Sequence, residues 1–490
     1  MMVQIPPLWT NKSTTEWVDA LIADYVTQYR RTGHPQRVDF RDLCASWPWA
    51  KRSDVYTHFL HRYPAKLLPY IPIFFLSSSL VSSDDTILDP FAGTGTVGLE
   101  SITHPARPRN CQLIEFSPLA RLISSAKTTP IDSAVLRKRF ASLSRLMREY
   151  DKEPTIPQFP GIDFWFRERA QRGLAKVRDC IETLDATVSE KDFFWACYSS
   201  IIRDMSRADP KVPPPVRLSA KKFPNAEKGA VKRKLAQKQS FEAPTLFRKA
   251  VRRNIGRMQE LWDVLSYTKS DKTVQVVGND ARNLTYAPYM GKGRLDEIQS
   301  SPLAGSSVGM VVTSPPYINA QKYARTTKFE LWWLELIGES AEALANFDRQ
   351  LIGTERVPYD EYVEVTPVGN ATADALLQRI FDIEPRRAGI VSKYFSDMRL
   401  ALREIKRALR PEGYCILVVG NNAIFKQVIP SNHILAEIAQ EEGFELKAML
   451  VDEIRSRGLI TKRHETAGMI ADEWIILLQK PASFHQAQEF

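Results

Sequence analysis

The sequence predicts an α/β protein in which a doubly wound, mostly parallel sheet is interrupted by a helical insertion. Short apolar strands alternate with helices near both ends of the 490-residue chain, the pattern of a parallel sheet covered by helices. A glycine-rich turn directly follows one of the early strands. Between about residues 131 and 267, helical periodicity replaces the strand pattern.

Residues 1–130 are expected to form N-terminal helices and the first half of the sheet. The expected elements are a helix over 14–30, a loop-like segment around Pro64, Pro69 and Pro72, a strand over 85–89, a turn at Gly93–Gly98 that opens a helix, and a strand over 110–116. Ser117 and Pro118 then predict a helix start, because serine is a good N-cap and proline suits the first helical position.

Residues 131–267 form the predicted insertion, which is helical at first and basic later. Helices are expected over 135–150, 166–186 and 192–205, and the pattern breaks at Pro213–Pro215. Between Lys211 and Glu260, 14 Lys or Arg stand against three Asp or Glu, which accounts for the whole net charge of +10. A mobile basic segment is expected here. Such a concentration of charge fits a polyanion binder, and equally a solvated linker.

Residues 268–490 are expected to complete the sheet. Strands are predicted over 274–277, 308–312, 414–419, 445–451 and 473–478, with a long helical region over 321–409. With the two earlier strands, the predicted sheet has seven strands.

Composition narrows the class of protein. The chain is 44% hydrophobic and 25% charged, as in ordinary globular proteins. No apolar run approaches the roughly 20 residues of a membrane span, and residues 1–10 carry no secretion pattern. The five cysteines are scattered without a CxxC pair, which argues against a metal site and disulfides and favours the cytoplasm.

The segment from Asp89 to Gly98 is the expected cofactor turn. Its glycines permit a tight bend and close approach of a ligand to the backbone, at the sheet edge where α/β proteins bind ligands. The letters also satisfy GxGxxG, and Glu115 lies where an acid could hold ribose hydroxyls, so a nicotinamide-dependent oxidoreductase is a rival. Asp89 favours another ligand, because a carboxylate would repel a pyrophosphate and attract the ammonium of a methionine moiety.

Asp280 ends a later predicted strand and could accept the amino group of an adenine. Aspartate is also a common helix N-cap, and on this segment alone the cap is the better interpretation.

The segment from Ser314 to Tyr317 is the expected target site. Pro315 and Pro316 must take the chain out of the sheet, and they leave carbonyl acceptors without neighbouring N–H donors. With the Ser314 hydroxyl, these acceptors could hold an exocyclic amino group with its lone pair toward a methyl donor. Tyr317 offers a face on which a flipped base could stack.

At these residues the sequence resembles DNA amino-methyltransferases of restriction–modification type, in particular their cytosine-N4 branch. Val312–Tyr317 matches the Thr-Ser-Pro-Pro-Tyr signature, Asp89–Thr96 matches the cofactor motif, and His61–Lys66 resembles a segment that often precedes it. Looser matches cover 323–333, 402–422 and the closing strand at 473–478. Adenine-N6 enzymes usually carry Asp or Asn at the position of Ser314, which favours cytosine.

The resemblance implies a class I methyltransferase fold, S-adenosylmethionine as cofactor and double-stranded DNA as substrate. The residues implied to bind the cofactor are Lys66, Asp89, Phe91, Gly93, Gly95, Thr96, Glu115 and Asp280, and those implied to hold the target base are Ser314, Pro315, Pro316 and Tyr317. A restriction endonuclease or defence-system partner is possible, and the insertion is a candidate DNA-recognition region. The rivals are an adenine-N6 or RNA methyltransferase, the oxidoreductase, and a non-enzymatic nucleic-acid-binding protein.

Overall fold

The computed structural model describes residues 11–45, 47, 55–64, 66–210, 212–222, 225–318, 322–424, 427–453 and 472–482. Residues 1–10, expected to carry no secretion signal, lie outside this part of the chain, as do Ala65 of the His61–Lys66 segment and Lys211 of the basic stretch. Within the described ranges, no helix combines the length and apolarity needed to cross a bilayer.

A central sheet organises the molecule. In spatial order its described strands are β1 (Gln36–Arg37), β13 (Glu445–Glu453), β14 (Asp472–Gln479), β10 (Leu409–Val419), β9 (Val308–Thr313), β2 (Ile87–Asp89), β3 (Cys111–Ile114) and β4 (Val274–Gly278). Strand β14 runs antiparallel to both neighbours, and the other pairs are parallel. The predicted α/β fold with a mostly parallel sheet is confirmed.

The predicted number of strands was wrong by one. All seven expected strands form, and β1 adds an eighth by pairing in parallel with β13 at the sheet edge. Two polar residues are too short a run to show the alternation by which strands are recognised.

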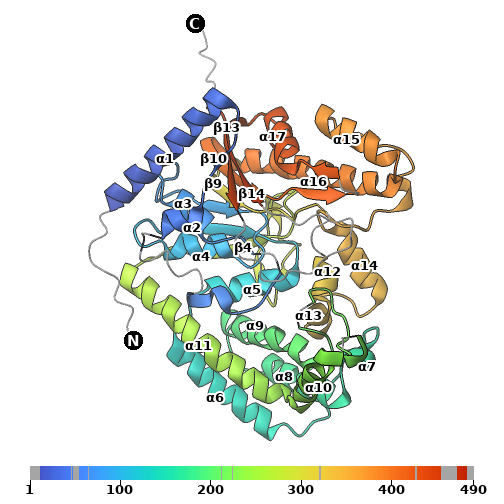
Figure 1. The fold of residues 1–490 in the computed structure, drawn as a ribbon. Helices are drawn as coiled ribbons and strands as arrows, with labels where there is room; N and C mark the ends of the chain where they lie inside the picture. The colour runs from blue at the N-terminus through green and yellow to red at the C-terminus, as the bar shows by residue number, and fades with distance from the viewer. Residues whose placement is uncertain are drawn as a thin grey trace.

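Alternate side chains of the strands enter two different cores. Leu88, Val311 and Leu417 pack with helices α15 (Ala371–Phe381), α16 (Pro385–Ala408) and α17 (Ser431–Glu441). Their sequence neighbours Ile87, Val312 and Ile416 pack on the other face. The helices of that face are α1 (Asn11–Thr32), α2 (Phe40–Cys44), α3 (Tyr70–Leu76) and α4 (Thr96–Thr103). Figure 1 shows these two helical layers on opposite sides of the sheet.

The insertion packs beside α4 and α5 (Pro118–Thr128), as Figure 1 shows. Its helices are α6 (Ser133–Glu149), α7 (Ile162–Trp165), α8 (Glu168–Glu182), α9 (Val188–Met205), α10 (Asn225–Ser240) and α11 (Ala243–Thr268). The expectation of a mobile basic segment was wrong, because most of it forms α10 and α11. Helix α11 sends Phe247, Val251 and Leu261 into the insertion core, and this burial stabilises a segment whose charge suggested a solvated chain.

One further expectation about local structure was wrong. The proline-marked segment contains helix α3, with Pro69 as N-cap and Pro72 in the first turn, where a helical N–H has no intrahelical partner to lose. The helical region expected over 321–409 is present and consists of several helices. They are α12 (Tyr323–Thr326), α13 (Lys328–Trp333), α14 (Ala341–Gln350), α15 and α16.

Smaller elements complete the described chain. They are the 3-10 helices η1 (Tyr56–Phe59), η2 (Ala220–Lys222) and η3 (Tyr359–Glu361), and the strand pairs β5 (Thr285–Tyr286) with β8 (Ser301–Pro302), β6 (Tyr289–Gly291) with β7 (Arg294–Leu295), and β11 (Asn422–Ile424) with β12 (Gln427–Ile429). All five cysteines are buried free thiols.

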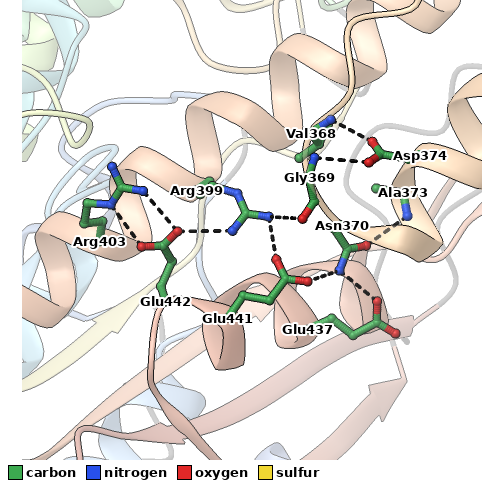
Figure 2. A network of polar contacts seen from close by, with 10 residues as sticks. All are labelled: Val368, Gly369, Asn370, Ala373, Asp374, Arg399, Arg403, Glu437, Glu441 and Glu442. Carbon is green, nitrogen blue, oxygen red and sulfur yellow. Dashed lines mark hydrogen bonds and ion pairs between the residues drawn. The ribbon is translucent and has the colours of Figure 1, made fainter.

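A polar network ties α15, α16 and α17 together, as Figure 2 shows. Arg399 of α16 contacts the carboxylates of Glu441 and Glu442 and the carbonyl of Gly369. Asn370, the N-cap of α15, donates to Glu437 and Glu441. The network fixes the layer that covers one face of β9 and β10, and so supports the sheet edge described next.

Candidate active site

The carboxyl ends of four adjacent strands carry the predicted site residues. Asp89 is the last residue of β2, Glu115 follows β3, Asp280 follows β4 and Ser314 follows β9. Because β9, β2, β3 and β4 are parallel neighbours, these residues reach the same edge of the sheet.

A buried hydrogen bond connects the glycine turn (Asp89–Gly98) to the proline segment (Ser314–Tyr317). The Thr313 hydroxyl donates to Asp89 Oδ1 over 2.6 Å, and the Phe91 amide donates to the same oxygen over 3.2 Å. Thr313 directly precedes Ser314, so the residue expected to face the cofactor and the segment expected to hold the base meet in one place.

The glycine turn leaves open space above its backbone. Gly93 and Gly95 have φ angles of 51° and 70°, left-handed values that glycine adopts at little cost. A Cβ atom placed on Gly93 would meet no atom within 4 Å. Glu115 braces the turn, since its two carboxylate oxygens accept from the Gly93 and Ser117 amides, each over 2.8 Å. The open backbone between two acids fits a ligand that has an ammonium group and hydroxyls.

Burial dominates the electrostatics of this edge. It raises the pKa of Asp89 to about 7, although the hydrogen bonds from Thr313 and Phe91 oppose the shift. Burial likewise raises the pKa of Glu115 to about 7, against the Ser117 and Gly93 amides. Both carboxylates therefore stand to gain from a bound cation, which would offset the cost of their desolvation.

Two side-chain hydrogen bonds hold the proline segment in place. Pro315 is buried, whereas Ser314, Pro316 and Tyr317 are partly exposed. The buried Asn422 side chain donates to the Ile318 carbonyl over 2.7 Å and anchors the segment. The Tyr317 hydroxyl donates to Glu473 of β14 over 3.2 Å. The predicted rigid corner at the sheet edge is thus present, with an aromatic ring fixed at its rim.

Lys66 and Thr96 lie at the base of the turn, in a cluster of buried charge. The buried Lys127 ammonium lies 3.5 Å from the Thr96 hydroxyl, and the Lys66 charge acts on both Lys127 and Glu100. Glu100 contacts the His58 ring over 2.6 Å. Two lysines therefore lie near the first turn of α4. Burial lowers the pKa of Lys127, and a bound anionic group would favour its charged form.

Asp280 is placed as predicted, but its carboxylate is engaged by Arg282. The Arg282 guanidinium donates to both Asp280 oxygens, over 2.8 to 3.2 Å, and also contacts Asp397 over 3.2 Å. The alternative role as a helix N-cap was wrong, because Asp280 caps a turn through the Arg282 amide and no helix begins there. Its part in holding an adenine stays a prediction.

Sequence reasoning gave no role to Thr313, Lys127 or Glu473. Thr313 and Glu473 lie within segments that the sequence identified as part of the site. No sequence pattern indicates which residue either of them contacts. Lys127 ends an ordinary amphipathic helix, and only the fold reveals its burial.

The basic stretch forms a surface on the insertion. Lys249, Arg252 and Arg253 lie on the exposed side of α11, and Lys232 and Arg233 lie on the exposed side of α10. Helix α11 also contacts η1 and α4.

Comparison with known proteins gives one relative of substantial coverage. No family model matches the chain. It is 26% identical over 407 residues, 78% of its own length and 80% of the relative's, to the type II methyltransferase M.MvaI of Kocuria varians. A candidate DNA modification methylase of Thermus thermophilus matches at 18% identity, covering 38% of this chain and 51% of that one, with a TM-score of 0.19.

The structure of that methylase with S-adenosylmethionine matches at 17% identity, again with a TM-score of 0.19, over 38% of this chain and 53% of that one. The chain thus spans about half the length of these solved structures, and so low a score carries no argument. The chain therefore has a mostly parallel α/β sheet and is similar, over most of its length, to a type II methyltransferase.

Proposed function

We propose that this protein is a DNA methyltransferase of restriction–modification type that uses S-adenosylmethionine to methylate an exocyclic amino nitrogen, N4 of cytosine before N6 of adenine. The observation that supports the proposal most directly is the Asp89–Thr313 hydrogen bond, which joins the glycine turn to the proline segment. Similarity to a type II methyltransferase over 78% of the chain supports the same conclusion.

The residues at the glycine turn suit the cofactor's chemistry. When bound, S-adenosylmethionine supplies an electrophilic methyl group. Asp89 is the partner for its ammonium, Glu115 for its ribose hydroxyls, and Lys66 with Thr96 for its carboxylate. Gly93 and Gly95 let the backbone come close, and Phe91 borders the same turn. This assignment gives Asp89, Glu115 and Lys66 each a ligand group of suitable chemistry.

The proline segment suits the amino group of a base. An amino nitrogen conjugated to a ring is a weak nucleophile, so positioning is the main contribution that a protein can make. Ser314 and the carbonyls around Pro315 and Pro316 accept the amino hydrogens, which leaves the nitrogen lone pair pointing away from them. Tyr317 stacks on the base, which must leave the duplex to reach the site.

The identity of the methylated base is settled by analysis of the product. Duplex DNA is incubated with the protein and the cofactor, digested to nucleosides and analysed by mass spectrometry. We expect N4-methylcytosine. N6-methyladenine would correct the base, transfer to RNA alone would correct the substrate, and no transfer to any nucleic acid would contradict the proposal.

Two substitutions test the target segment separately from the cofactor turn. Ser314→Ala and Tyr317→Ala should each lower the rate of methyl transfer by about 100-fold or more, since positioning terms of this kind are worth several kcal/mol. Cofactor affinity, measured by calorimetry, should change little. Normal turnover of Tyr317→Ala on duplex DNA would exclude the stacking role.

We infer that the insertion contacts the DNA backbone. Its exposed lysines and arginines supply the positive charge that phosphate binding requires, and α11, which carries several of them, contacts η1 and α4. A restriction endonuclease or defence-system partner would fit such an enzyme, and a pull-down from the native host tests for one.

A further inference from the structure

The turn between β6 and β7, residues 291–293, lies between the insertion and the start of α5. A Cβ atom on Gly291 would lie 2.7 Å from Val188 of α9, and one on Gly293 would lie 1.9 Å from the Pro118 carbonyl oxygen. The two glycines have φ angles of 86° and 74°, which also disfavour a side chain. This turn, called the hairpin turn below, is therefore in direct contact with both α9 and α5.

Asp192 of α9 organises the hairpin turn. Its buried side chain accepts from the Lys292 amide over 2.7 Å through Oδ1. Its Oδ2 accepts from the Tyr289 hydroxyl over 2.6 Å and from the Ser125 hydroxyl over 3.0 Å. The Tyr289 hydroxyl accepts in turn from the Gly293 amide over 3.0 Å. One carboxylate of the insertion thus determines where two amides of the turn are placed.

Arg121 of α5 connects the hairpin turn to Glu115. Its Nε donates to the Gly293 carbonyl over 2.7 Å. Its Nη1 donates to the Glu115 and Phe116 carbonyls, each over 2.8 Å. A series of hydrogen bonds, joined through the backbone of Gly293, therefore leads from Asp192 in the insertion to the acid that braces the glycine turn.

Burial makes this series specific in its geometry. It raises the pKa of Asp192 to about 6, against the hydrogen bonds from Tyr289, Lys292 and Ser125, and it lowers the pKa of Arg121 to about 10. A buried charge that loses a hydrogen-bond partner is costly. Both side chains are therefore stable only with their partners in place, and a shift of the hairpin turn would be passed on to the backbone at Glu115.

We propose that Asp192 is a positioning residue that acts through the hairpin turn and Arg121 to hold Glu115 where its carboxylate binds the ribose hydroxyls of the cofactor. This inference rests on the proposed function, which gives Glu115 that ligand, and deepens it, since the insertion becomes part of the support of the cofactor site. A change within the insertion should then weaken recognition of the ribose in particular.

Asp192→Asn tests this, because the amide has nearly the same shape but presents a donor where Tyr289 and Ser125 need an acceptor. Affinities of the full chain are measured by calorimetry for two probes, S-adenosylhomocysteine and its 2′,3′-dideoxy analogue, which lacks both ribose hydroxyls. We expect the wild type to bind the analogue about 30-fold more weakly, as hydrogen bonds to a carboxylate imply. The variant should lose about tenfold in affinity for S-adenosylhomocysteine and little for the analogue, so that the ratio of the two affinities falls.

Three further variants make the test specific. Glu115→Ala removes the ribose partner itself and should bind the two probes almost equally. Tyr289→Phe removes the link between Asp192 and the Gly293 amide and should lower the ratio as Asp192→Asn does. Asp179→Asn is the matched control, because Asp179 of α8 also accepts a tyrosine hydroxyl over 2.6 Å, from Tyr150. It should keep the wild-type ratio.

The outcomes separate the role of Asp192 from the function on which it rests. If the wild type binds neither probe, the proposed function fails, and the inference with it. If the wild type binds both equally, Glu115 does not hold the ribose, and the inference is overturned although the cofactor stands.

If the wild type discriminates and Asp192→Asn keeps its ratio, only the inference is overturned. An equal loss for both probes has the same meaning, because it reports general damage to the fold. So does a control, Asp179→Asn, whose ratio falls as far as that of Asp192→Asn. If Asp192→Asn does not fold, Tyr289→Phe decides: a wild-type ratio in that variant overturns the inference.

Discussion

Asp89 is the residue at which the two halves of the site converge. It ends the strand that leads into the glycine turn, and it accepts a hydrogen bond from the strand that leads into the proline segment. The same side chain is buried, which raises its pKa to about 7. Ionisation of a carboxyl group that is buried in this way lowers the stability of the folded chain. A binding site can retain such a group, because the ionised carboxylate binds a cation strongly.

Asp89→Asn should therefore increase stability and weaken function. The folded pKa lies above the value of about 3.9 for an unfolded aspartate, so the stability that the bound proton contributes is lost as pH rises from about 4 through about 7. The asparagine variant escapes this loss. Relative to the wild type it should gain on the order of 2–3 kcal/mol between about pH 5 and 8, while cofactor affinity falls.

Urea unfolding of the cofactor-free proteins at the two pH values measures this difference. If the difference in unfolding free energy between Asp89→Asn and the wild type is the same at both pH values, folding does not raise the pKa of Asp89.

The motif residues could be predicted from sequence, but their partners could not. Asp89, Gly93 and Ser314 stand in local patterns whose chemistry is readable. Thr313 and Glu473 act through contacts with residues 224 and 156 positions away in the chain. Only the order of the strands brings those pairs together, and no local pattern encodes it.

At the scale of helices and strands, predictions from local composition failed where packing in the folded protein determined the structure. Proline in α3 suggested a loop, yet it falls in the first turn, where it costs no hydrogen bond. The charge of α11 suggested a mobile segment, yet its apolar side fills the insertion core. Deleting residues 211–260 would remove part of that core, so loss of DNA binding by such a deletion would not identify a DNA contact.

The network in Figure 2 predicts unequal effects for two arginines of α16. Arg399→Met should cost about 1–3 kcal/mol of unfolding free energy, because it leaves Glu441, Glu442 and the Gly369 carbonyl without a shared donor. Arg403 lies one turn away, is 59% exposed and contacts Glu442 alone, so Arg403→Met should cost less than about 1 kcal/mol. Chemical denaturation compares the two, and equal losses would show that the network does not stabilise the helical layer.

At the scale of the whole molecule, the sheet and the insertion differ in charge as well as in structure. The sheet presents acids and a proline corner at one edge, and the insertion carries the positive excess of a chain whose net charge is +10. The α/β class, the order of elements and the helical insertion could be predicted, because alternation and helical periodicity are properties of segments. The edge strand β1 and the folding of α10 and α11 could not, because they depend on what those residues pack against.

The charge distribution predicts how DNA affinity responds to salt. Replacing the exposed Lys249 and Arg252 of α11 with Gln should weaken DNA binding and make the dependence of log K on log salt shallower by about one for each phosphate that is no longer neutralised. Arg30→Gln with Arg31→Gln on the exposed end of α1 removes equal charge from another surface and serves as the control. Fluorescence anisotropy over a salt series measures both. Identical slopes for the two variants would place the DNA contact away from α11.

A crystal structure of the protein with S-adenosylhomocysteine, the expected product, is the most direct test of the account. We expect the amino group of the ligand to lie at Asp89 and the ribose of the ligand at Glu115. The sulfur of the ligand should face Ser314 and Tyr317 across the space where a base would enter. A ligand bound elsewhere, or one whose sulfur points away from the proline segment, would contradict the claim that the two halves of the site act together.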